Sequence, residues 1–176
     1  MHSKLPALST FKDNARVRRL TQAALCAAIA VALSGFSFPV GPSRCYPIQH
    51  AMNAVAGVLL GPWYACAAAL IAATVRNLMG TGTLLAYPGS IFGALAVGFA
   101  ARFLFERNRA FAAFAEPLAT ATIGAWAASY IAGNPALYPM LAWAFLTSAA
   151  PGAVIGFLAL KSLQIRRANK TTPQER

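Results

Sequence analysis

Six apolar runs, separated by short segments rich in glycine, proline or charge, divide the chain. They cover residues 20–38, 48–60, 64–78, 90–105, 117–131 and 140–160. Runs this apolar are typical of helices that cross a bilayer, although several fall below the ~20 residues that a straight, perpendicular helix needs. The pattern predicts an all-α integral membrane bundle of six transmembrane helices, in which polar residues line a pocket.

Basic, polar segments stand at both ends of this apolar region. We predict tails at 1–19 and 161–176 and a membrane domain at 20–160. A cleavable signal peptide also begins with a basic segment and an apolar run, but the run 20–38 is long for that purpose and has no clear small-residue cleavage site. We therefore interpret 20–38 as the first transmembrane helix.

Alanines recur along this first helix. Ala24, Ala28 and Ala32 follow one another at four-residue spacing, so they share one helix face. A smooth face of small residues suits close packing between helices in lipid. The alternative is that alanine is simply abundant in this run.

A polar, glycine-broken segment at 76–90 lies between two apolar runs. Its backbone polar groups cannot face lipid, so it must lie at a membrane surface or line a cavity enclosed by protein. Arg76, at the end of an apolar run, is costly there unless it meets a partner or reaches the surface. We predict that 76–90 forms one wall of a small-molecule site; the alternative for Arg76 is snorkelling, or a bond to loop carbonyls.

Three hydrogen-bonding side chains lie where the second run begins. Gln49 and Asn53 are four residues apart and share a helix face, with His50 beside them. The preceding loop, 39–47, contains three prolines and is therefore stiff. The three side chains either bond neighbouring helices or contact a ligand at a preorganised site.

Composition agrees with a membrane protein. The chain is 58% hydrophobic and 11% charged, against about 25% charged in soluble domains. A net charge of +11 could indicate nucleic-acid binding, but all but two of the positive residues lie at the ends and in one loop. Cys26, Cys45 and Cys66 lack metal-ligand spacing, and we interpret them as small hydrophobes, with no metal or disulfide role.

Acidic residues are scarce: there are four, and we expect none of them inside an apolar run. Proton-coupled transporters usually carry buried Asp, Glu or His relays, so we expect no proton coupling by this chain itself. The P-loop motif of ATPases is also missing from the sequence. Any active transport would then draw its energy from elsewhere.

The positive charges predict the topology. With six helices both termini lie on one side, together with the loop near 102–109, and that side holds 13 of the 15 Lys and Arg residues. The positive-inside rule makes this side cytoplasmic. Only Arg44 and Arg76 lie on the other side, where topology does not explain them.

The same topology gathers the remaining polar segments at the outer face, where we predict a pocket with aromatic walls and a few polar anchors. The predicted substrate-binding residues are Gln49, His50, Asn53, Arg76, Asn77, Thr81, Thr83, Tyr87, Trp126, Tyr130 and Asn134. Aromatic residues at these depths also fit an interfacial belt, and for Tyr138 and Trp143 both interpretations stay open.

Four segments of the chain resemble the ThiW family. They are FPVG at 38–41, CYPIQH at 45–50, NAVAGVLLGPWY at 53–64 and RNLMGTGTLLAYPGS at 76–90. The resemblance extends over about residues 16–162, but its specific part is 38–90, since the later helices match only in type.

The resemblance implies the substrate-binding (S) component of an energy-coupling factor (ECF) transporter, a multi-pass protein of the bacterial cell membrane without a cofactor. It would bind a thiamine precursor from outside, hydroxyethylthiazole or its phosphate, and deliver it through a partner ECF module of one transmembrane coupling protein and two ATPases. Ala24, Ala28 and Ala32 fit the small-residue face that docks this module in other S components. Pyrimidine or whole thiamine as substrate stays open.

Two rival functions remain. One is a membrane enzyme with His50 as base, which we disfavour because the sequence places no carboxylate or nucleophile beside this histidine. The other is an autonomous facilitator or exporter, which would need no ATPase.

Overall fold

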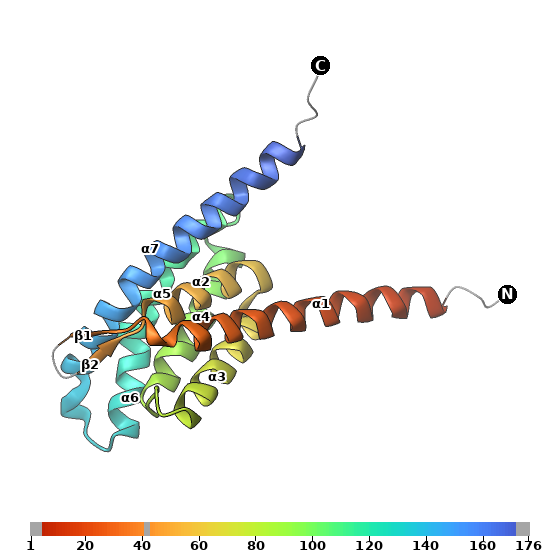
Figure 1. The fold of residues 1–176 in the computed structure, drawn as a ribbon. Helices are drawn as coiled ribbons and strands as arrows, with labels where there is room; N and C mark the ends of the chain where they lie inside the picture. Colours follow the sequence, from red (N-terminus) through yellow and green to blue (C-terminus); the bar gives the residue numbers. More distant parts are fainter. Residues whose placement is uncertain (1–4, 41–42, 172–176) are drawn as a thin grey trace.

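In the computed structural model, which describes residues 5–40 and 43–171, the apolar runs form helices, the structure that satisfies backbone hydrogen bonds without water. The elements are α1 (Leu5–Ala32), η1 (Leu33–Gly35), β1 (Phe38–Val40), β2 (Ser43–Cys45), α2 (Pro47–Leu60), α3 (Pro62–Leu78), α4 (Ala86–Phe103), η2 (Arg109–Phe114), α5 (Ala115–Ala119), η3 (Thr120–Gly124), α6 (Ala125–Ile131), η4 (Pro135–Leu137) and α7 (Tyr138–Thr171). Because η2, α5, η3 and α6 follow one another almost without a break, the described residues trace six helical courses, as predicted (Figure 1).

Two features differ from the sequence prediction. β1 and β2 form a short antiparallel hairpin, with Pro39 opposite Arg44, where only a stiff loop was expected. Helix also continues into the predicted tails, over 5–19 in α1 and 161–171 in α7. The first turns of α1 and the last turns of α7 extend beyond the bundle, away from the hairpin (Figure 1).

Proline and glycine set the short connection between α2 and α3. Pro47 opens α2 and Pro62 opens α3, positions where the missing N–H of proline costs nothing. Gly61 between the two helices has φ 88°, a conformation that favours glycine. Gly61 and Pro62 thus form the short connection, and α2 and α3 are neighbours in the bundle.

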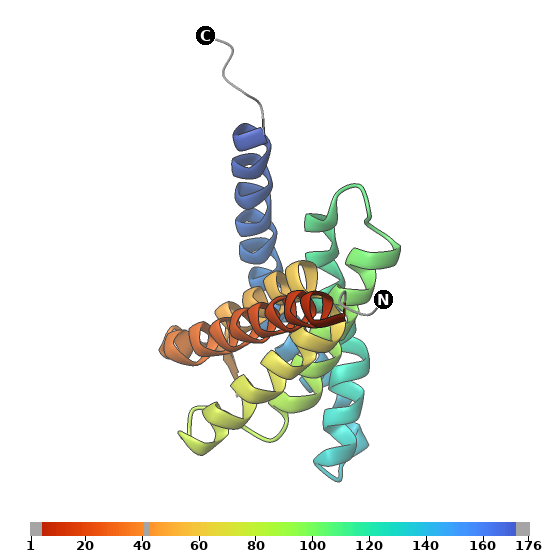
Figure 2. The same cartoon turned by 90° about the vertical axis from the view of Figure 1, so that its right-hand side faces the viewer.

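α2 lies in the middle of the bundle and contacts α1, α3, α4 and α7. α1 crosses over both α2 and α3 (Figure 2). Glycines allow the closest approaches: a Cβ at Gly152 of α7 would lie 2.5 Å from the Cβ of His50, and one at Gly98 of α4 would lie 2.4 Å from the Cα of Pro62. Small residues at such crossings let helices in lipid pack closely.

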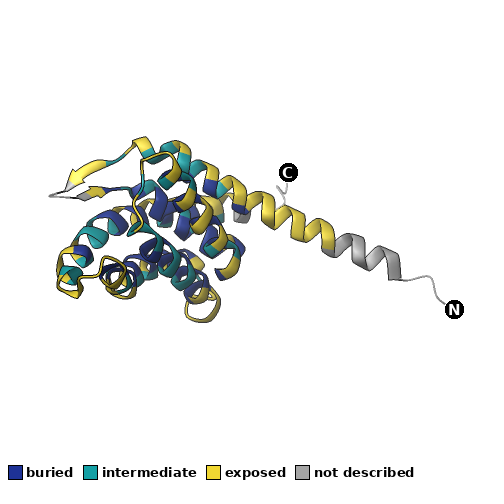
Figure 3. Ribbon diagram, turned by 90° about the horizontal axis from the view of Figure 1, so that it is seen from below, coloured by how far each residue is buried: buried dark blue, intermediate teal, exposed yellow. Residues whose placement is uncertain are grey.

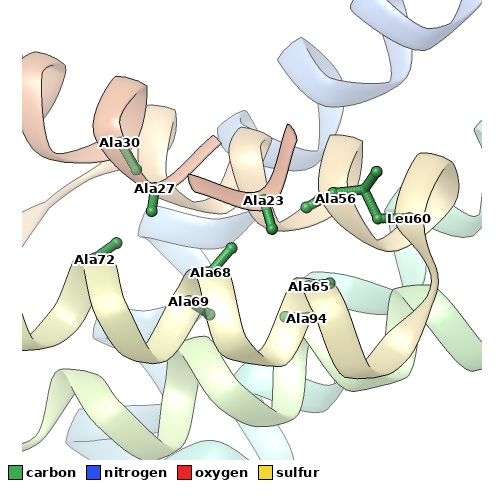
Figure 4. Packing of buried hydrophobic residues seen from close by; sticks show 10 residues of the cluster. All are labelled: Ala23, Ala27, Ala30, Ala56, Leu60, Ala65, Ala68, Ala69, Ala72 and Ala94. Carbon is green, nitrogen blue, oxygen red and sulfur yellow. The ribbon is translucent and has the colours of Figure 1, made fainter. Parts of the chain in front are cut away.

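Alanines hold α1 against α3. Ala23, Ala27 and Ala30 are buried and face Ala68 and Ala72 (Figure 4). The alanine face singled out from the sequence, Ala24, Ala28 and Ala32, lies outside this contact and is exposed. α1 thus packs into the bundle with one alanine face and leaves a second one open.

The outer surface of the helices is apolar. Exposed side chains include Leu70 of α3, Phe99 of α4 and Leu158 of α7, and Figure 3 shows exposed residues on the outward sides of the helices and buried ones where helices meet. In the described residues, Asp13–Gly35 and Pro135–Arg166 are each long and apolar enough to span a membrane. An apolar exterior around a closely packed, alanine-rich interior fits lipid as the solvent.

Candidate functional site

A cavity of about 250 Å³ opens between the hairpin, the start of α2, the end of α3, the start of α4, η3 and α7. Its wall is largely apolar but contains several polar side chains, and it is called the polar cavity below. This volume is just under the roughly 300–1,000 Å³ of sites for drug-sized ligands, so it suits a compound with one small ring. Its lining consists of Arg44, Tyr46, Gln49, His50, Arg76, Gly82, Thr83, Ala86, Gly89, Ser90, Thr120, Ala144, Phe145 and Ser148.

A buried cluster around Glu116 supports one wall of the polar cavity. The Nδ1 atom of His50 lies 2.5 Å from Oε1 of Glu116. Asn53 Nδ2 and Thr120 Oγ1 each donate to the same carboxylate oxygen, at 3.3 Å. With Nδ1 held by Glu116, the His50 ring has a fixed orientation and its Nε2 is the nitrogen left for other partners.

Glu116 corrects two statements drawn from the sequence. We expected no acidic residue inside an apolar run, hence no buried Asp, Glu or His relay, and no carboxylate beside His50. Glu116 is instead fully buried and bonded to this histidine. The two residues are 66 positions apart, and Glu116 lies just before the predicted fifth run, so the sequence pattern placed it near the surface. A buried carboxylate needs such partners because its desolvation is costly.

Gln49, which precedes His50 on α2, joins α2 to α4 at the cavity wall. Its Nε2 donates to Ser90 Oγ, and Asn53 Nδ2 donates to the Ser90 carbonyl at 3.3 Å. Gln49 Oε1 is buried and has no hydrogen-bond partner among the described residues. Gln49 and His50 therefore both bond neighbouring helices and line the cavity, whereas Asn53 only bonds neighbouring elements and supports them from behind.

Arg76 lies at the end of α3, with 2% of its surface exposed. Its guanidinium carbon is 3.9 Å from the centroid of the Tyr46 ring, a cation–π arrangement. Its Nη2 donates to the Thr81 carbonyl at 3.0 Å, and the amides of Thr81 and Gly82 donate back to the Arg76 carbonyl. The start of the segment 76–90 thus folds around Arg76, which also lines the cavity.

The other predicted residues of this segment have different roles. Asn77 Nδ2 donates to the carbonyls of Ala73 and Thr83, both at 3.1 Å. Tyr87 bonds Thr74 through its hydroxyl at 3.1 Å. Of the predicted Asn77, Thr81, Thr83 and Tyr87, only Thr83 lines the polar cavity, while the rest hold the segment in shape.

Three predicted site residues lie away from the cavity. Trp126 and Tyr130 are more than half exposed and pack against each other, with ring centroids 4.8 Å apart. Asn134 is exposed, and its side chain accepts a hydrogen bond from the Ala136 amide, which caps η4. Trp143 is also exposed, as the belt interpretation expects.

Several residues that line the cavity were not predicted from the sequence. Tyr46 lies within the CYPIQH segment, and its amide donates to Ser148 Oγ at 2.7 Å, which ties α2 to α7. Ser148 and Phe145 come from the last apolar run, where a serine among apolar residues was the available signal. Ser90 lies at the end of the 76–90 segment. The other lining residues absent from the predicted list are Arg44, Gly82, Ala86, Gly89, Thr120 and Ala144.

Comparison with known proteins agrees with the resemblance seen in the sequence. Residues 20–166 match the family described as thiamine-precursor transporter protein (ThiW). Comparison with curated proteins and with solved structures gives no match. The matched range includes every residue that lines the polar cavity. The chain therefore belongs to the ThiW family of thiamine-precursor transporter proteins.

Proposed function

We propose that this membrane transporter protein is the S component of an ECF importer and that its polar cavity captures a thiamine precursor of the thiazole class. The observation that carries the proposal is the cavity itself, in which Gln49 and His50 stand at the wall with their orientations held by buried partners. Preorganised polar groups in a small cavity reduce the ordering cost of binding.

The chemistry of hydroxyethylthiazole matches this lining. The molecule has a flat ring, a ring nitrogen that accepts a hydrogen bond, and a hydroxyl group. The hydroxyl can donate a hydrogen bond to the unpartnered Oε1 of Gln49 or to Nε2 of His50, which accepts in the tautomer whose Nδ1–H donates to Glu116. Tyr46 and Phe145 offer aromatic surfaces to the ring.

The outer face is where the substrate enters in this proposal. The cavity lies at the end of the bundle that carries the hairpin, while the first turns of α1 and the last turns of α7 extend the other way (Figure 1). Those ends and the 102–109 loop hold most of the positive charge, which favours the cytoplasmic side for them.

The exposed alanine face of α1 is the proposed docking surface for the ECF module. Ala24, Ala28 and Ala32 are exposed although α1 packs closely through its other alanines. Ala28→Trp is expected to abolish co-purification with the module and to leave ligand affinity unchanged. Leu158→Trp, on the exposed side of α7, is the matched control. Equal co-purification of Ala28→Trp and Leu158→Trp would reject this docking face.

Uptake in cells tests the function. Bacteria that cannot make thiazole are given this protein with an ECF module, with a module whose ATPases are inactive, or alone, and uptake of labelled hydroxyethylthiazole is measured. We expect uptake only with the active module. Equal uptake by the protein alone would favour the autonomous facilitator instead, and no uptake with any arrangement, together with no binding by the purified protein, would reject the thiazole class.

A further inference from the structure

Two arginines, Arg44 and Arg76, line the polar cavity. They are also the only two of the 15 Lys and Arg residues that the charge pattern does not assign to the cytoplasmic side. The positive-inside rule therefore does not explain the positions of Arg44 and Arg76. Because both line the same cavity, we look for the explanation in the chemistry of its ligand.

Arg76 is a buried cation without a charged partner. Across the described residues the one ion pair joins His50 and Glu116, so no carboxylate neutralises Arg76. The guanidinium has five N–H donors; one bonds the Thr81 carbonyl, and Nε has no partner among the described residues. Burying a charge in this state is costly unless an anion joins it.

A role in shaping the loop does not require this charge. Asn77, one residue later, holds the Thr83 carbonyl with a neutral amide at 3.1 Å, while Arg76 holds the Thr81 carbonyl with a full positive charge at 3.0 Å. The π-face of Tyr46 stabilises the cation but does not neutralise it.

Arg44 adds a second positive charge at the opening of the cavity. It lies on β2, is exposed, and its Nε donates to Ser37 Oγ at 3.2 Å, across the hairpin. Its position in the paired hairpin limits its freedom. The lining contains no Asp or Glu among the described residues, because Glu116 lies behind His50.

We propose that the cavity recognises an anionic group on its substrate, and that the preferred ligand is the phosphate monoester of hydroxyethylthiazole rather than the neutral alcohol. The phosphate lies between Arg76 and Arg44, since arginine binds phosphate through parallel N–H···O bonds. The thiazole ring then lies toward His50 and Gln49. This inference rests on the proposed thiazole site and names the substrate form that the site prefers.

Binding measurements on the wild-type protein in nanodiscs test the preference. Isothermal titration calorimetry compares hydroxyethylthiazole, its phosphate monoester and inorganic phosphate. We expect the ester to bind at least about tenfold more tightly than the alcohol, since one charge-assisted hydrogen bond supplies about that factor, and more tightly than inorganic phosphate. An ester that binds no better than the alcohol overturns the inference but leaves the thiazole function standing. Inorganic phosphate as tight as the ester overturns it too, and binding of neither thiazole compound rejects the proposed function itself.

Variants that remove one positive charge show which arginine gives the preference for the phosphate ester over the alcohol. Arg76→Gln and Arg44→Gln are each expected to reduce the ester-to-alcohol affinity ratio several-fold, while Arg102→Gln, an exposed arginine outside the cavity, keeps the wild-type ratio. Arg44 is exposed, so Arg44→Gln serves if Arg76→Gln does not fold. An unchanged ratio in the folded cavity variants overturns the assignment.

Discussion

Replacement of Glu116 by alanine removes the group to which three side chains from α2 and η3 are bonded. Its Oε1 is 2.5 Å from His50 Nδ1 on α2 and 3.3 Å from both Asn53 Nδ2 on α2 and Thr120 Oγ1 on η3. Hydrogen bonds inside membrane proteins contribute about 0.6 kcal/mol on average and about 1.7 kcal/mol at most. Loss of three such contacts should therefore lower the free energy of unfolding by about 2–5 kcal/mol.

Glu116→Gln removes the negative charge but keeps the shape of the side chain, so it measures the contribution of the charge to stability. The amide keeps an oxygen at the same place, but charge-assisted hydrogen bonds are about twice as strong as neutral ones. We therefore expect Glu116→Gln to lose roughly half of what Glu116→Ala loses. Glu106→Ala, which removes an exposed carboxylate, is the control and should change stability by less than about 0.5 kcal/mol.

Equilibrium unfolding in dodecyl maltoside micelles with increasing sodium dodecyl sulfate, followed by circular dichroism, measures these differences. The order of stability should be wild type and Glu106→Ala together, then Glu116→Gln, then Glu116→Ala. A Glu116→Ala variant within about 0.5 kcal/mol of the wild type would refute the view that this cluster holds α2 to α5.

Two further predictions concern packing and topology. Gly152→Val places a side chain where a Cβ would already lie 2.5 Å from the Cβ of His50, so it should lower the free energy of unfolding by about 1–3 kcal/mol through overpacking and weaken ligand binding. Ala159→Val, on the exposed side of α7, should do neither. Equal stability and equal ligand affinity of the two variants would reject the close crossing of α2 and α7. Single cysteines at Thr83 and Arg107, in a background without the native cysteines, should react with a membrane-impermeant maleimide from opposite sides of the membrane, and labelling of both from one side would reject the proposed orientation.

Helical periodicity and charge predicted the local features well. The spacing of Gln49, His50 and Asn53 placed three polar side chains in one helical turn, and the structure joins all three to α4 or α5. The cost of Arg76 in an apolar run predicted a special environment, and the residue proves to be buried at the cavity wall.

Contacts that depend on tertiary packing could not be predicted from the pattern of apolar and polar positions in the sequence. Trp126 and Tyr130 were predicted in the pocket because their positions along the fifth run gave the right depth. Depth does not give rotation about the helix axis, and the π-helical turn Thr120–Gly124 that precedes α6 changes which face points inward. The partnership of Glu116 with His50 joins residues far apart in sequence, which no local spacing reveals.

Filling the polar cavity tests the central claim most directly. Ala144 of α7 lines the cavity, and Ala159 lies exposed on the same helix. The Ala144→Trp and Ala159→Trp proteins are placed in nanodiscs and shown to be folded by circular dichroism. Calorimetry then measures the affinity of each variant for hydroxyethylthiazole and for its phosphate. The proposed function predicts that Ala144→Trp binds neither compound while Ala159→Trp binds like the wild type. Wild-type affinity in a folded Ala144→Trp protein would contradict it, because the substrate would then bind elsewhere.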